Sequence, residues 1–144
     1  QMPQSYTRIW THAVWGTKHR TPFIKVDIEG IIHDFIRTQF REQGCPIRIV
    51  NGTPDHVHSL FLFSPTKSVS DVIKQVKGSS SHFINAQELI DKKFEWQNGY
   101  GAFSVSDSAV EAVFRYIKNQ KRHHRIETYE QEFEELFTFF DLNE

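Results

Sequence analysis

Cysteine and long apolar runs are nearly missing from this 144-residue sequence. Cys45 stands alone, which excludes an intrachain disulfide or a metal site built from several thiolates and favours a reducing compartment. No run approaches the roughly 18 apolar residues of a membrane helix, and the first residues lack the basic and apolar regions of a secretory signal. We therefore expect a cytoplasmic protein that is not inserted in a membrane.

Two familiar kinds of site are also missing. A dinucleotide-binding loop needs three spaced glycines between a strand and a helix, whereas Gly99 and Gly101 lack the third glycine and that setting. A zinc deaminase needs His-x-Glu and Pro-Cys-x-x-Cys motifs, whereas the sequence offers His-x-His and one cysteine. We expect no small-molecule cofactor.

The composition, with 38% hydrophobic and 14% aromatic residues, is that of a folded globule. Its net charge of −1 conceals an asymmetry, because residues 127–144 contain seven acids and no Lys or Arg. The preceding chain has 17 basic and 11 acidic residues, and residues 115–125 carry five Lys or Arg with no acid. We expect one domain over residues 5–126, followed by an acidic helical tail over residues 127–144.

Apolar periodicity predicts the order β-α-β-β-α-β with further helices. The expected strands are residues 6–17, 47–51, 56–63, 94–97 and 102–105, and the expected helices are residues 28–40, 69–84, 108–117 and 128–140. Capping boxes at Ser68 with Asp71 and at Ser108 with Glu111 predict two helix starts. This order predicts an α+β fold of the ferredoxin-like, split βαβ type. Its antiparallel sheet has helices on one face and leaves the other face available for a site.

The first candidate site motif is His56-Val57-His58 in an expected strand. Alternate residues of a strand face the same side, so both imidazoles can converge on one metal ion. They share this face with Leu60 and Leu62, so the rings need polar partners there. Chance alone would give about 0.4 such pairs among eight histidines, so the motif also fits two ordinary buried histidines.

Tyr116 and Gln120 form a second candidate pair, on the last expected helix of the domain. At a spacing of four residues, they lie on one face of a helix. Tyrosine can act as a covalent nucleophile, an amide oxygen can complete a metal site, and the surrounding cations can hold phosphates. The common alternative for Tyr116 and Gln120 is a half-buried tyrosine beside a surface amide. The common alternative for the basic segment is a solvated helix end whose cations interact favourably with the helix dipole.

Five segments together resemble the single-tyrosine HUH transposases of the insertion-sequence type, including those associated with repetitive extragenic palindromes. They occur in the family's order between residues 6 and 124 and read WTHAVWGTKHRTPF, PDHVHSLF, QVKGSSSHFIN, FEWQNGYGAFSVS and YIKNQKRHH. No single segment is specific for this family, but the combination of all five is. The resemblance implies a ferredoxin-like catalytic domain whose C-terminal helix carries the tyrosine.

The same resemblance implies a DNA transposase that works as a homodimer on single-stranded DNA with hairpin-forming ends. It would cleave and rejoin this DNA through a 5′-phosphotyrosine intermediate, using Mg²⁺ or Mn²⁺. His56, His58 and Gln120 would be the metal ligands, and Tyr116 the nucleophile. The tyrosine-bearing helix can complete the site of the partner subunit in this family. The cations expected along the DNA path are Lys18, Arg20, Lys74, Lys77, Lys118, Lys121 and Arg122.

Three other functions remain open at the level of sequence. A non-catalytic nucleic-acid-binding module on the same fold would bind DNA without forming a covalent adduct. A domesticated relative would recognise palindromic repeats and move nothing. A metal-dependent hydrolase of a small phosphorylated substrate would turn over repeatedly without needing Tyr116.

Overall fold

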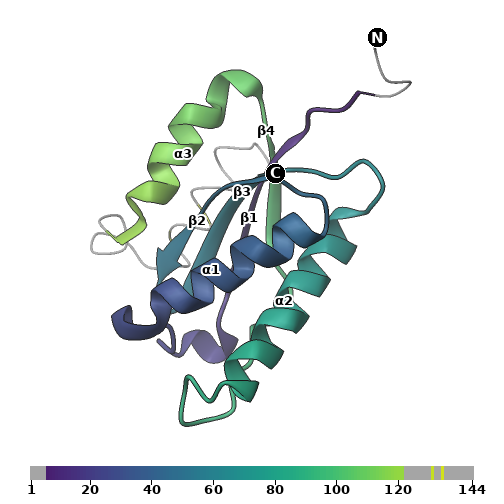
Figure 1. Cartoon of the computed structure of the whole chain (residues 1–144). Coiled ribbons are helices and arrows are strands. Elements are labelled where there is room, and N and C mark those ends of the chain that lie inside the picture. Colours follow the sequence, from purple (N-terminus) through teal and green to yellow (C-terminus); the bar gives the residue numbers. More distant parts are fainter. Residues whose placement is uncertain (1–5, 122–130, 132–133, 135–144) are drawn as a thin grey trace.

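The computed structural model describes residues 6–121 together with Gln131 and Glu134 (Figure 1). Its elements, in chain order, are β1 Trp10–Gly16, η1 Lys18–Arg20, α1 Val26–Glu42, β2 Ile47–Thr53, β3 His56–Leu62, α2 Val69–Ala86, β4 Gly101–Val105, η2 Asp107–Ala109 and α3 Val110–Lys118. The predicted boundary between residues 126 and 127, most of the acidic tail and Arg122 lie outside the described residues. None of the helices in the described ranges is long and apolar enough to cross a membrane.

The four strands form one antiparallel sheet in the order β2-β3-β1-β4. β1 and β2 are joined through α1 and separated by β3, which is the split βαβ arrangement that the sequence predicts. In the central pair, Gly16 lies opposite His56 and Val14 lies opposite His58. The predicted fold class is confirmed.

Helices α1 and α2 cover one face of the sheet and enclose the main core (Figure 1). Trp15 from β1 and Phe61 from β3 are fully buried there, together with Ile36 and Val76 from the two helices. Alternation along a strand sends every second residue to this face, which explains why Val57 and Phe61 belong to this core but His58 and Leu60 do not.

Helix α3 packs on the opposite face, which the sequence pattern leaves open. A second apolar cluster joins Leu60 of β3 to Ile117 of α3, with Trp10 and Phe114 partly buried beside them. The amphipathic face of α3 needs apolar surface to cover, and the second face of the sheet supplies it. The histidine pair consequently lies between the sheet and α3.

Two local predictions are wrong. Residues 94–97 form no strand, because only Trp96 pairs, in an isolated bridge to Thr17. The capping box at Ser108 is also absent. A 3₁₀ turn precedes α3, Ser108 shares a hydrogen bond with Ser106, and the Glu111 carboxylate accepts one from Arg48.

The other capping prediction and the end of α1 agree with expectation. The Ser68 side chain caps α2 by accepting a hydrogen bond of 3.1 Å from the backbone N–H of Asp71. Gly44 follows α1 with a φ of +75°, a conformation that glycine adopts without the steric cost that a side chain would bring.

Candidate active site

The histidine pair of β3 forms the floor of the candidate site. His56 and His58 are both fully buried, and their ring centroids lie 5.1 Å apart. Both rings lie on the α3 face of the sheet, as strand alternation predicts. Gly52 of β2 allows the neighbouring strand to approach, because a Cβ atom there would lie 2.1 Å from the carbonyl oxygen of His56.

His56 is held by the turn that precedes it. Its Nδ1 atom lies 2.7 Å from the carboxylate oxygen Oδ1 of Asp55 and 2.9 Å from the hydroxyl of Thr53. Thr53 also donates a hydrogen bond to Asp55, so the three side chains form one network. A carboxylate only accepts, so Nδ1 carries a hydrogen, and in the neutral ring Nε2 then keeps its lone pair.

Gln120 lies beside that lone pair. Its side-chain oxygen Oε1 is 3.2 Å from Nε2 of His56, and the residue is fully buried. Two ligands at right angles on one Mg²⁺ ion lie about 3 Å apart, so this separation suits a shared cation. The two residues are 64 positions apart in the chain, so the fold brings them together.

His58 has a partner that the sequence analysis missed. Nε2 of His12, on β1, lies 2.8 Å from Nδ1 of His58, and the two rings stack. His12 is diagonal to His58 in the register of the sheet, a distance that ring side chains can span. The predicted split βαβ fold places another strand between β1 and β2, but only the register of β1 on β3 shows that His12 lies close to His58.

Tyr116 projects from α3 towards the same histidines. Its ring is edge-on to that of His58 at a centroid distance of 5.8 Å and to that of His12 at 6.3 Å. The side chain is half-buried. The structure therefore brings Tyr116, Gln120, His56 and His58 of one chain into a single site.

The sequence predicts that Tyr116 and Gln120 lie on one face of a single helix. In the structure they do not share one continuous helix. Helix α3 ends at Lys118, and Gln120 begins a new helical turn after Asn119. The Asn51 amide donates hydrogen bonds to the carbonyl oxygens of Ile117 and Lys118. These oxygens are consequently satisfied by a strand side chain, and asparagine at position 119 is a poor helix former.

Lys121 anchors the turn that carries Gln120. Its ammonium group donates to the carboxylate of Glu29 at 2.5 Å, to the Asn51 side-chain oxygen at 3.2 Å and to the carbonyl of Gly52 at 3.4 Å. The contacts tie this turn to α1 and β2, next to the residues that hold His56.

The predicted DNA-path cations lie in three places. Lys18 and Arg20 follow β1 at the His56 end of the sheet, Lys74 and Lys77 lie on α2, and Lys118 and Lys121 lie at or just after the end of α3.

Lys18 pairs with Glu95, and its hydrogen bond and charge hold the pKa of that carboxyl below its usual range. Lys77 donates to the carbonyls of residues 97 and 99, and burial lowers its pKa. Their contact with DNA stays a prediction.

The donor set of this site suits a divalent cation. Within residues 6–121, 131 and 134, no group of three His, Cys, Asp or Glu side chains is arranged to hold a metal ion. A site here therefore needs the amide oxygen of Gln120 beside the nitrogens of His56 and His58. Two imidazoles and one oxygen form a mixed donor set that suits Mn²⁺ by ligand type and also admits Mg²⁺.

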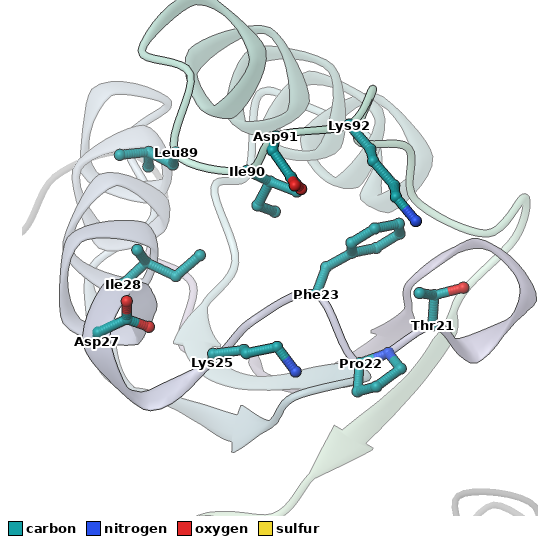
Figure 2. Close-up of a pocket in the computed structure, with 10 residues that line it drawn as sticks. All are labelled: Thr21, Pro22, Phe23, Lys25, Asp27, Ile28, Leu89, Ile90, Asp91 and Lys92. Atoms are coloured by element: carbon teal, nitrogen blue, oxygen red, sulfur yellow. The ribbon is translucent and has the colours of Figure 1, made fainter.

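A separate cavity of about 460 Å³ lies on the other side of the sheet (Figure 2). Its lining includes the apolar residues Phe23, Ile28 and Ile90 and the cations Lys25 and Lys92. The apolar lining packs against the main core rather than against α3. None of the predicted site residues that the structure describes lines this cavity.

Comparison with known proteins identifies the family. The sequence model of the IS200-like transposases matches residues 5–120. This chain belongs to the IS200-like transposase family. The family resemblance inferred from the five sequence segments is thereby confirmed, and the transposase family brings with it DNA cleavage and strand transfer as the general activity.

Individual relatives agree with this assignment. The chain is 25% identical over 114 residues to the ISDra2 transposase TnpA of Deinococcus radiodurans, covering 76% of this chain and 81% of the relative. A crystal structure described as a candidate transposase from Deinococcus radiodurans R1 superposes with a TM-score of 0.67 at 22% identity, covering 83% and 96% of the two chains. A REP-associated tyrosine transposase bound to a REP hairpin has a TM-score of 0.63 at 15% identity, covering 86% and 73%. Both structures share the fold.

Proposed function

We propose that this IS200-like transposase cleaves and rejoins single-stranded DNA at hairpin-forming ends through a 5′-phosphotyrosine intermediate. The observation that carries the proposal is the convergence of one tyrosine on a buried histidine pair and a buried amide. Tyr116 lies 5.8 Å, ring to ring, from His58, and Gln120 lies 3.2 Å from His56. A hydrolase of small phosphorylated substrates would give no reason for a tyrosine there.

His56, His58 and Gln120 would hold the divalent ion, Mg²⁺ or Mn²⁺. When bound, this ion polarises the scissile phosphate and offsets the charge that develops on its oxygens. Asp55 and Thr53 orient the His56 ring, so its Nε2 lone pair is directed at the site before substrate arrives. The site is thus preorganised by the chain's own hydrogen bonds.

Tyr116 supplies the nucleophile. Its phenolic oxygen forms a bond to the scissile phosphorus, the bond from phosphorus to the 3′-oxygen breaks, and the phenolic proton leaves the tyrosine as the 3′-oxygen gains one. The products are a 5′-phosphotyrosine and a free 3′-hydroxyl. Because the covalent link keeps the free energy of the phosphodiester, attack by another 3′-hydroxyl reverses the step and joins strands without ATP.

The proposal that DNA is the partner rests on the exposed cations of the described residues and on a structurally similar protein. A structurally similar REP-associated tyrosine transposase has been seen bound to a REP hairpin, and the described chain has exposed cations at Arg20, Lys74 and Lys118. Phosphate neutralisation by such cations gives affinity that falls as salt rises. Lys118→Glu should weaken binding and lower the salt slope, whereas Arg41→Glu, at an exposed cation outside the proposed path, should change neither.

A homodimer acting in the cytoplasm, at the nucleoid when bound to DNA, completes the proposal. The dimer rests on the family resemblance, and light scattering at several protein concentrations tests it. A monomer at every concentration up to that used in the cleavage assay would contradict the dimer and leave the proposed chemistry intact.

The decisive experiment is a denaturing-gel assay for a covalent protein–DNA adduct. Labelled single-stranded DNA from both strands flanking the gene is incubated with protein and Mn²⁺, Mg²⁺ or a chelator. Tyr116→Phe removes only the nucleophilic oxygen, and Tyr100→Phe, which alters an exposed tyrosine, is the matched control. We expect a metal-dependent adduct in the wild type and in Tyr100→Phe, and none in Tyr116→Phe.

Other outcomes favour the alternatives. Tight DNA binding with no adduct from either strand and with either metal would favour a non-catalytic or domesticated module. Repeated hydrolysis of a small phosphorylated substrate that survives Tyr116→Phe would favour the hydrolase. An adduct that persists in Tyr116→Phe would leave the tyrosine chemistry wrong even if the family activity holds.

A further inference from the structure

A third histidine, His12 on β1, links the proposed metal ligands to the proposed nucleophile. Its Nε2 atom lies 2.8 Å from Nδ1 of His58, and both side chains are buried. The two rings stack with centroids 5.1 Å apart and planes inclined by 30°. On other sides His12 meets Phe103 and Tyr116, each at a centroid distance of 6.3 Å.

This contact decides which nitrogen of His58 can bind another ligand. A hydrogen bond between two neutral imidazoles needs one N–H donor and one lone-pair acceptor. When Nδ1 of His58 donates, its Nε2 atom keeps a lone pair for the site. When Nδ1 accepts instead, the hydrogen is on Nε2, and His58 has no lone pair left for the cation.

We propose that His12 is a positioning residue that accepts the hydrogen bond from Nδ1–H of His58 and so presents the Nε2 lone pair to the divalent ion. The inference rests on the proposed function for the ion and on the 2.8 Å contact for the partner. Asp55 already plays this part for His56, with its carboxylate 2.7 Å from Nδ1. Metal-bound histidines generally need such a partner on the second nitrogen.

Three variants of the full chain separate this role from simple packing. His12→Phe keeps a ring against Tyr116 and Phe103 but removes the acceptor. His12→Gln keeps an acceptor, because its amide oxygen is as many bonds from Cβ as Nε2 is. Ser59→Ala is the matched control, because it removes a buried hydrogen bond of 3.3 Å between the same two strands, to the carbonyl of Ala13.

Two readouts are measured for each protein. Long-range ¹H–¹⁵N correlation spectra of the metal-free, ¹⁵N-labelled protein report which ring nitrogen of His58 bears hydrogen. Titration calorimetry gives the affinity for Mn²⁺ alone. We expect the Nδ1–H form in the wild type, in His12→Gln and in Ser59→Ala, and its loss in His12→Phe. Affinity for Mn²⁺ should fall about 10- to 100-fold in His12→Phe and stay within about threefold in the other two.

Each failure has its own meaning. An Nε2–H form of His58 in the wild type would overturn the role of His12, even if His12→Phe does not fold. So would an affinity in His12→Phe within about twofold of the wild type. A wild type with the Nδ1–H form that binds neither Mn²⁺ nor Mg²⁺ would instead overturn the metal step of the proposed function. A purely structural role would lower the melting temperature of His12→Phe and leave both readouts unchanged.

Discussion

His33, a buried histidine outside the candidate site, should make the protein unstable in acid. It lies on α1 with 3% of its surface exposed, and its Nε2 atom has no hydrogen-bond partner among the described residues. Burial, with repulsion from Arg37 and Lys121, lowers the pKa of His33 to about 3. The Glu29 carboxylate, 3.7 Å from Nδ1, favours the protonated ring, but desolvation of so buried a group outweighs it.

The size of the effect follows from proton linkage. Between pH 6.5 and pH 3 the unfolded chain holds a proton on His33 that the folded chain does not. The free energy of unfolding therefore falls by about 1.4 kcal/mol for each unit that the pH drops in this window. From pH 6.5 to pH 4.5 the loss is about 3 kcal/mol, a large part of the stability of a small domain.

The variant His33→Leu should not show this fall in the free energy of unfolding at low pH. At pH 7.5 the variant should be as stable as the wild type or slightly more stable, because a buried nitrogen without a partner has been removed. At pH 4.5 it should exceed the wild type by about a further 3 kcal/mol. Urea unfolding at pH 7.5, 5.5 and 4.5 measures the difference, in which the groups common to both proteins cancel. His82→Leu, at an exposed histidine, is the control. A gap between wild type and His33→Leu that is the same at pH 7.5 and pH 4.5 would refute the reasoning.

Four further predictions concern the site and its supports. Mixing Tyr116→Phe with His58→Ala should not restore adduct formation, because one chain supplies both residues; recovery of the adduct on a gel would show exchange between subunits. Gly52→Ala should lower the melting temperature by several degrees, measured by circular dichroism, because its Cβ would meet the carbonyl of His56 at 2.1 Å. Lys77→Met should reduce the free energy of unfolding in urea by about 1–2 kcal/mol through two lost hydrogen bonds to carbonyls. Cys45 is buried with a raised pKa, so it should react with a thiol reagent on the order of 100-fold more slowly in the native protein than in guanidinium.

The sheet and its main core could be predicted because their signals are local. Period-two alternation locates the central strands within a few residues, and it places His56 and His58 on one face from the sequence alone. The capping box at Ser68 was recognisable because its partner, Asp71, begins an uninterrupted amphipathic run. The same motif at Ser108 failed because Glu111 is bound by Arg48, 63 positions away.

What could not be predicted depends on contacts between distant segments. His12 became visible only through the register of β1 on β3, which puts it diagonal to His58. The break after Lys118 depends on an asparagine of β2, because the amide of Asn51 takes up the carbonyls at the end of α3. Neither contact can be recognised from the spacing of residues along the sequence.

The position of α3 explains why a buried histidine pair is compatible with this fold. Alternation forces His56 and His58 out of the main core, but α3 then covers them, so water cannot satisfy their nitrogens. Two partners offset that cost: Asp55, in the turn before β3, contacts the His56 ring, and His12, on β1, contacts the His58 ring. Because the same covering segment also delivers Tyr116 and Gln120, the arrangement that buries the pair is the one that completes the site.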